Sequence, residues 1–305
     1  MSAPATLVTG AAGFVAGWLI PALEAAGHRV MGTHRRGQRS HARQSFEVEL
    51  SDAAVVDALI AELRPATVVH LAALASPRDA TRSPLDAIRD NYLSVDRLAR
   101  ALARHAPGAR WLHVSSGAVY GGHAQGEPSP TEEEALLPGD AYAASRVAAE
   151  RRVALAIRDD GIDALVARAF NHSGPGRGAA YAESSFARQL VAIERREAPA
   201  VLRVGNLEGA RDFSDVRDVV EAYLLLIERG EPAGVYNVAS GDVRSLRDIL
   251  LRLIELSGVT PRIEVDPERY RPADPGEQVI SGNAARLREL GWAPRHDSLL
   301  QSVAA

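Results

Sequence analysis

The chain has 305 residues, a formal net charge of −4 at pH 7 and no cysteine. The slightly acidic balance gives no electrostatic reason to expect nucleic acid or an anionic membrane as a partner, and the lack of cysteine excludes disulfides, thiolate nucleophiles and cysteine-based zinc sites. No apolar run approaches the roughly 20 residues of a membrane span, and the N-terminus shows no signal-peptide pattern, which favours a cytoplasmic location.

In chain order, apolar strand-like runs alternate with amphipathic helix-like stretches. Strands are expected at residues 5–10, 28–34, 46–50, 66–73, 109–116 and 163–170. Helices are expected between most of them, for example at 14–27, 52–63 and 84–103. This alternation predicts an α/β fold of the Rossmann type, a doubly wound parallel sheet with helices on both faces. Pro21 lies inside the first helix and is expected to kink or break it.

The character of the chain changes after about residue 170, where NHSGPGRG (171–178) reads as a loop rich in glycine and proline. Further helices are expected at 184–197, 214–230, 245–258 and 283–291. We therefore predict a Rossmann domain over residues 1–170, to which 212–238 return. The remaining segments, 171–211 and 239–305, are expected to form a smaller C-terminal α/β domain that binds the substrate.

The glycine-rich stretch TGAAGFVAG (9–17) follows the first strand and opens the first helix. Gly10 and Gly13 permit a tight turn and close approach of a pyrophosphate, and the helix N-terminus supplies free N–H groups. This context predicts a dinucleotide site, although a glycine-rich turn alone is a weak signal. The residues expected at the cofactor are Gly10, Ala12, Gly13, Phe14, Val15, Glu49, Leu50, Leu71, Ala72 and Ala73.

The second strand ends in GTHRR, which bears on the choice of cofactor. A site for NAD(H) would place Asp or Glu here to bind the ribose hydroxyls, whereas this chain offers His34, Arg35 and Arg36. Arginine suits a 2′-phosphate through bidentate, charge-assisted hydrogen bonds. The segment therefore favours NADP(H), with NAD(H) as the alternative. The other interpretation is that these arginines only solvate a loop.

Three further stretches are HLAA (70–73), VSSGAVYG (114–121) and YAASR (142–146). Together with residues 9–17 they resemble the extended short-chain dehydrogenase/reductase family, also called the NAD-dependent epimerase/dehydratase family, over essentially the whole chain. The resemblance implies that Ser116, Tyr142 and Arg146 take the places of that family's catalytic Ser/Thr, Tyr and Lys. It also places Tyr142 and Arg146 at the nicotinamide ribose.

Arg146 is the departure from the family pattern. A tyrosine with a pKa near 10 needs a cation within about 4–6 Å to ionise more readily, and arginine keeps that charge but cannot lose its proton. The chain contains no lysine, and all 35 of its Lys and Arg residues are arginine, so the exchange follows a chain-wide bias. An active enzyme is the favoured interpretation, and an NADP(H)-binding regulator without catalysis is the alternative.

The segment after Ser116 narrows the reaction. It reads Gly117-Ala118, without the acidic residues that nucleotide-sugar 4,6-dehydratases of the family carry, and the cysteine of GDP-fucose synthases is absent. The histidines show no metal spacing, so no metal is expected. Hydride transfer at a carbonyl remains, by a reductase or by a 4-epimerase that holds NAD tightly.

Four later segments, 168–176, 204–226, 235–241 and 271–274, look like the GDP-6-deoxy-4-keto-mannose reductases. The resemblance implies NADPH-dependent reduction of the C4 ketone of a GDP-4-keto-6-deoxyhexose, giving GDP-D-rhamnose or its C4 epimer. Substrate contacts are expected from Ser116, Gly117, Tyr142, Asn171, Arg211, Arg271 and Asp274. Helices at about 84–104 and 140–158 resemble those that pair in the dimers of the family, so a homodimer is expected.

Overall fold

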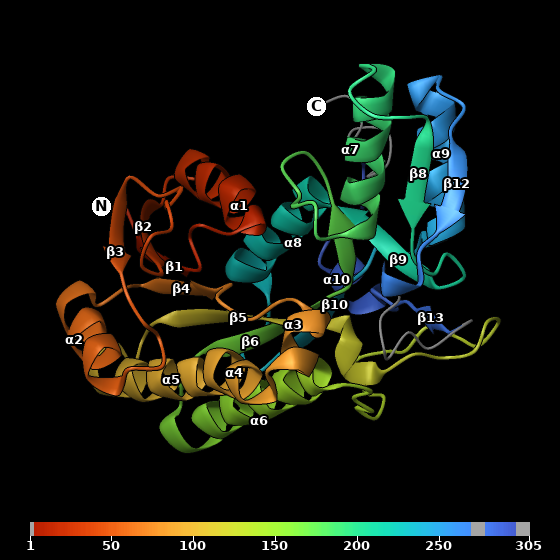
Figure 1. The fold of residues 1–305 in the computed structure, drawn as a ribbon. Helices are drawn as coiled ribbons and strands as arrows, with labels where there is room; N and C mark the ends of the chain where they lie inside the picture. Colours follow the sequence, from red (N-terminus) through yellow and green to blue (C-terminus); the bar gives the residue numbers. More distant parts are fainter. Residues whose placement is uncertain (1–2, 270–277, 297–305) are drawn as a thin grey trace.

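The computed structural model describes residues 3–269 and 278–296 (Figure 1). A seven-stranded, all-parallel sheet forms the larger lobe, in the order β10-β6-β5-β4-β1-β2-β3. Its strands are β1 (Ala5–Thr9), β2 (Arg29–His34), β3 (Gln44–Glu47), β4 (Thr67–His70), β5 (Arg110–Ser116), β6 (Ala164–Ala169) and β10 (Val235–Val238). The strand order reverses between β1 and β4, where Rossmann-type sheets open a ligand crevice at the carboxyl ends of their strands.

Helices cover both faces of this sheet, as Figure 1 shows. One face carries α1 (Phe14–Ala25) and α8 (Val216–Arg229), and the other carries α2 (Ala53–Leu63), α5 (Ser94–His105) and α6 (Ala141–Asp160). Two separate apolar clusters fill the spaces between the sheet and these helices. The doubly wound Rossmann-type fold predicted from the sequence is therefore confirmed.

Short elements connect these layers on the side where the strands end. They are α3 (Pro77–Arg82), α4 (Pro84–Ile88), the π-helical turn η1 (Arg89–Leu93) and the 3₁₀ turn η2 (Gly117–Tyr120). The stretch 84–103 was expected to form one helix, but η1 interrupts it between α4 and α5. A π-helical turn in such a position often marks a functional site.

The smaller lobe lies beside the carboxyl ends of the sheet (Figure 1). It contains β7 (Asn171–Ser173), α7 (Ala182–Glu194), β8 (Val201–Val204), β9 (Ala210–Asp215), β11 (Val243–Ser245), α9 (Leu246–Ser257), β12 (Arg262–Val265), η3 (Pro267–Arg269), β13 (Val279–Ile280) and α10 (Ala285–Glu289). Strand β9 pairs with β7, β11 and β13, and β8 pairs with β12. A third apolar cluster, built mainly from α7, β8 and α9, forms the core of this lobe.

Pro21 does not break α1, which runs through this residue from Phe14 to Ala25, so that expectation is wrong, and the alternative, a kink, stays a prediction. Proline removes one backbone hydrogen bond from a helix and crowds the carbonyl of the residue four positions earlier. Here the ring is exposed to solvent, so water can solvate the freed carbonyl, and the buried side of α1 stays packed on the sheet. Among the described helices, none is long and apolar enough to cross a membrane.

Candidate active site

A cavity of about 1160 Å³ lies between the two lobes, at the carboxyl ends of the strands of the large sheet. The β1–α1 turn, the ends of β2, β4 and β5, the start of α6 and the segment 171–181 all contribute to its wall. Sheets that reverse their strand order bind ligands in this position. The volume exceeds that of a drug-sized pocket, which suits a dinucleotide together with a second large ligand.

The β1–α1 turn has the geometry that a pyrophosphate needs. Gly10 has φ +70°, and a Cβ on it would lie 2.9 Å from backbone atoms of Ala72, so only glycine fits without strain. Helix α1 begins at Phe14, and its N-cap residue Gly13 supplies no side-chain hydrogen bond. The first N–H groups of α1 therefore keep donors for an anion at the positive end of the helix dipole.

The predicted cofactor residues line the cavity almost without exception. Those found in its wall are Gly10, Ala12, Gly13, Phe14, Val15, His34, Arg35, Glu49, Leu50, Leu71, Ala72, Ala73, Tyr142 and Arg146. Arg36 is different: it is exposed and does not belong to the wall. We call the part of the wall formed by His34, Arg35, Glu49 and Leu50 the adenosine end, because residues after the second strand of a Rossmann fold typically face the adenosine ribose of a bound dinucleotide.

Ser116, Tyr142 and Arg146 meet in the wall of the same cavity. Ser116 is the last residue of β5, while Tyr142 and Arg146 lie four residues apart on α6 and so share one face of that helix. The Ser116 hydroxyl accepts a hydrogen bond from the Ala118 N–H at 3.2 Å, and its own proton stays available as a donor. Three side chains from two elements thus line the same cavity.

Arg146 is a buried cation whose charge is not matched by a carboxylate in the described part of the chain. The residue is 3% exposed, one Nη donates to the Val114 carbonyl, and Nε has no hydrogen-bond partner among the described residues. A buried charge without a counter-charge is unfavourable, so it favours an anion beside it. A bound phosphorylated ligand would supply that negative charge.

Buried histidines surround this cation and stay neutral. Burial, followed by the positive charge of Arg146, lowers the pKa of His70 to about 3, and the same two causes hold the pKa of His113 well below its ordinary value. The ring of His70 stacks on that of His113, and its Nδ1 lies 2.9 Å from the Thr9 hydroxyl. Burial also raises the pKa of Tyr223, which lies in the cavity wall.

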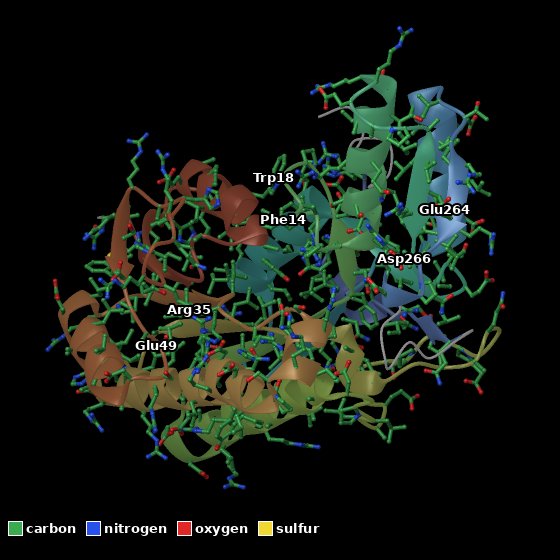
Figure 2. All side chains as sticks on the ribbon, in the orientation of Figure 1. Phe14, Trp18, Arg35, Glu49, Glu264 and Asp266 are labelled. Carbon is green, nitrogen blue, oxygen red and sulfur yellow. The ribbon has the colours of Figure 1, made fainter. Side chains whose placement is uncertain are left out.

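Arg177 is a cavity residue that sequence reasoning missed. Its guanidinium lies 5.0 Å from the centre of the Phe14 ring and 3.5 Å from that of the Tyr181 ring, which are cation–π distances. Its Nε has no hydrogen-bond partner within residues 3–269 and 278–296. Burial, and then the charge of Arg177, lowers the pKa of His172 to about 4. Figure 2 shows Phe14 and Trp18 on α1, on the side that faces α7.

Only some of the predicted substrate residues are found in the cavity wall. Asn171 and Arg211 line the cavity, whereas Gly117 does not, because it packs against the ring of Phe170. A side chain at Gly117 would collide with that ring, so the glycine serves packing. Arg211 donates to the carbonyls of Ala210 at 2.8 Å and Gln278 at 3.2 Å. Arg271 and Asp274 lie outside the described residues.

This fold and this site define a Rossmann-type nucleotide-dependent enzyme. The sequence profile of the NAD dependent epimerase/dehydratase family matches residues 6–239, and the chain belongs to that family. The family predicted from the sequence is thereby confirmed, together with the expectation of an enzyme.

Individual relatives have several activities. The chain is 36% identical to the GDP-6-deoxy-D-mannose reductase of Pseudomonas aeruginosa over 75% of each chain. It is 31% identical to the UDP-glucose 4-epimerase of Mycolicibacterium smegmatis over 95% of this chain and 93% of the relative.

Two solved structures share the fold of this chain over nearly its whole length. RMD of Pseudomonas aeruginosa, solved with NADPH, has a TM-score of 0.86 and 31% identity over 99% of this chain and 98% of that one. The UDP-glucose 4-epimerase of Thermus thermophilus, solved with NAD, has a TM-score of 0.86 and 27% identity over 98% of both chains. The whole fold is therefore shared, and only the site can distinguish the reactions.

Proposed function

We propose that the protein reduces the C4 ketone of a GDP-4-keto-6-deoxyhexose with NADPH, giving GDP-D-rhamnose or its C4 epimer. The observation that carries the proposal is that Ser116, Tyr142 and Arg146 share one cavity with the Gly10–Phe14 turn and with Arg35 at the adenosine end. Similarity to the Pseudomonas aeruginosa reductase supports the choice of reaction, and similarity to the structure of RMD with NADPH supports the choice of cofactor. NAD(H) is the weaker alternative cofactor.

The side chains have separate tasks in this reaction. NADPH, when bound, would supply the hydride. The Tyr142 hydroxyl would donate a proton to the ketone oxygen as that oxygen gains charge. The buried charge of Arg146 stabilises the phenolate that Tyr142 leaves behind. Ser116 donates a hydrogen bond to the same ketone oxygen and holds it at the Tyr142 hydroxyl.

Arginines account for the phosphates of both ligands. We assign Arg177 to the pyrophosphate of the cofactor, because it lies over Phe14, the first residue of α1. Arg211, and by resemblance Arg271, are assigned to the pyrophosphate of the GDP sugar, where a planar guanidinium can pair with two oxygens. Asn171 and Asp274 complete the proposed contacts, to the hexose or phosphate and to the guanosine respectively.

A 4-epimerase is the second candidate, favoured by the similarity to the Mycolicibacterium smegmatis enzyme over nearly the whole chain. Such an enzyme keeps its NAD through both hydride transfers. The adenosine end argues against it, because Arg35 stands where an NAD site would place a carboxylate to bind the ribose hydroxyls. Analysis of nucleotide released from the purified, denatured protein separates the two: stoichiometric bound NAD would favour the epimerase.

The direct test mixes the purified protein with GDP-4-keto-6-deoxy-mannose and offers NADPH and NADH separately, following cofactor oxidation at 1:1 stoichiometry with the product. We expect NADPH to be oxidised. Folded protein that binds NADPH but oxidises neither cofactor with this sugar would refute the proposal. The Arg146→Lys variant then separates an enzyme with a modified catalytic pair, which gains or keeps rate, from a non-catalytic regulator, which stays inert.

Two helices support the proposed homodimer. Leu85 of α4 is 83% exposed, and Ile88 of α4 and Leu155 of α6 also expose apolar surface; α4 leads through η1 into α5. We propose that α5 and α6 pair with their counterparts in a second copy, which light scattering of the purified protein tests. The cytoplasmic location and the division into a cofactor domain and a substrate domain stay predictions.

A further inference from the structure

A chain of ion pairs runs from the adenosine end of the cavity into the π-helical turn η1. Arg35 Nη2 lies 2.7 Å from Asp90 Oδ2, and Arg89 Nε lies 2.9 Å from Asp90 Oδ1. Arg89 also reaches Asp86 Oδ1 at 2.7 Å. Each oxygen of the Asp90 carboxylate therefore has its own guanidinium. Of these four residues, Arg35 and Asp90 line the cavity. Glu49, which lies near Arg35, also lines it.

Asp90 is the immobile partner in this arrangement. Its side chain is 2% exposed, whereas that of Arg35 is 47% exposed. The backbone that carries Asp90 is held by its neighbour Asn91, whose amide accepts from the Leu74 N–H at 2.8 Å and donates to the Ser145 hydroxyl at 2.8 Å. The carboxylate thus has a defined place in the cavity wall, and the flexible arginine adapts to it.

The Asp90 carboxylate faces two guanidinium groups, Arg35 and Arg89, and Arg89 is also paired with Asp86. Glu49 is the other acid near Arg35, but its Oε2 lies 3.9 Å from Arg35 Nε, too far for a hydrogen bond. Asp90 therefore occupies one edge of the Arg35 guanidinium, and other N–H donors of Arg35 stay available to an anion in the cavity.

We propose that Asp90 is a positioning residue that holds Arg35 at the adenosine end for the 2′-phosphate of NADPH, and so sets the preference for NADPH over NADH. The inference rests on the proposed function, specifically on its cofactor. An arginine has several rotatable bonds, and binding a phosphate normally costs the entropy of ordering them. Asp90 has already ordered the side chain, and such preorganisation increases affinity.

The test compares dissociation constants for NADPH and NADH, measured by fluorescence titration of the intact protein without any sugar. Asp90→Asn removes the charge and keeps the shape, and Asp86→Asn is the matched control because Asp86 pairs with Arg89 but not with Arg35. We expect Asp90→Asn to weaken NADPH about tenfold and to leave NADH unchanged, since NADH has no 2′-phosphate. Asp86→Asn should leave both values as in the wild type.

The double variant Arg35→Gln/Asp90→Asn shows whether Asp90 acts through Arg35. If it does, Asp90→Asn adds no further loss of NADPH affinity in the Arg35→Gln background. This comparison remains valid if Asp90→Asn lowers stability, because NADH binding of each variant reports the folded fraction. Equal weakening of both cofactors would show a merely structural role and overturn the inference.

Two other results would also overturn it. Unchanged NADPH binding in Asp90→Asn would show that Arg35 needs no anchor. Tighter NADPH binding would show that Asp90 competes with the phosphate for Arg35. Failure of the proposed function is recognised separately: wild-type protein that binds NADH as tightly as NADPH would refute the cofactor assignment itself, before any variant is considered.

Discussion

Two arginines line different parts of the same cavity, and different interactions hold them. Arg35 is paired with the buried carboxylate of Asp90, whereas Arg177 lies on the rings of Phe14 and Tyr181 and has no ion pair within the described part of the chain. Figure 2 shows the corresponding neighbourhoods apart: Glu49 lies close to Arg35, and Phe14 lies on α1 toward the smaller lobe.

This difference shows how one cavity can recognise two phosphate groups through different interactions. A carboxylate gives Arg35 a defined direction, which suits recognition of a single phosphate that only NADP(H) carries. An aromatic cradle fixes the position of Arg177 but leaves its charge uncompensated, which suits a pyrophosphate that NAD and NADP share. We therefore expect Arg35 to discriminate between the cofactors and Arg177 to bind both.

The largest effect is expected for Tyr142→Phe, which tests whether this tyrosine acts through its hydroxyl or through its ring. Tyr142→Phe removes the proposed proton donor and should lower kcat on the keto sugar by about 10³-fold, in the range for loss of a general acid. Tyr181→Phe is the matched control, because it keeps the ring beneath Arg177, and kcat should change less than about twofold. Equal losses in both variants would contradict the assignment of Tyr142.

Acid unfolding tests the buried histidines beside the uncompensated charges of Arg146 and Arg177. The pKa of His70 is about 3 and that of His172 about 4, both below the ordinary 6.5. Below about pH 6.5 the unfolded chain binds protons at these histidines that the folded protein does not bind. The free energy of unfolding therefore has its full value above about pH 6.5 and falls as the pH drops toward the folded-state pKa values. At about pH 5 each histidine should cost about 2 kcal/mol of unfolding free energy.

Urea unfolding at a series of pH values measures that slope. The His172→Gln variant should lose less stability than the wild type between about pH 6.5 and pH 5, because one of the groups is removed. His123→Gln, a substitution of a partly exposed histidine outside the cavity wall, serves as the control and should follow the wild-type curve. A wild-type free energy of unfolding that is constant over this range would contradict the neutral buried state.

Arg177→Met keeps a long apolar side chain on the two rings but removes the charge. We expect the dissociation constants of NADPH and NADH to rise together, by about thirtyfold, the loss of one strong charge-assisted contact. Arg188→Met, on the exposed surface of α7 and away from the cavity, is the control and should bind both as the wild type does. A loss restricted to NADPH would remove the distinction between the two arginines.

Arg35→Gln gives the smallest expected effect and the sharpest contrast with Arg177. NADPH binding should weaken about tenfold or somewhat more, while NADH binding stays within about twofold of the wild type. Parallel titrations of Arg36→Gln provide the matched control, since this neighbouring arginine is exposed outside the cavity wall. If Arg36→Gln reproduced the loss and Arg35→Gln did not, the placement of the phosphate site at Arg35 would be wrong.

Much of the fold and of the candidate site follows from local patterns in the sequence. The alternation of strands and helices predicted the parallel sheet, because the spacing of apolar residues indicates which face of each element is buried. Gly10 and Gly13 predicted the dinucleotide turn, since the turn is completed within a few residues. Ser116, Tyr142 and Arg146 were predicted through motifs that place each residue at the end of a strand or on one turn of a helix.

Only the tertiary structure decided the rest, because those contacts join segments that are distant in the chain. It separated Arg35 from Arg36, which are equivalent in sequence, by directing one into the cavity and the other to solvent. It paired Arg35 with Asp90, brought Arg177 onto Phe14 and assigned Gly117 to packing against Phe170. Local patterns indicate burial and turns, whereas the partner of a charge depends on which distant segments the fold brings together.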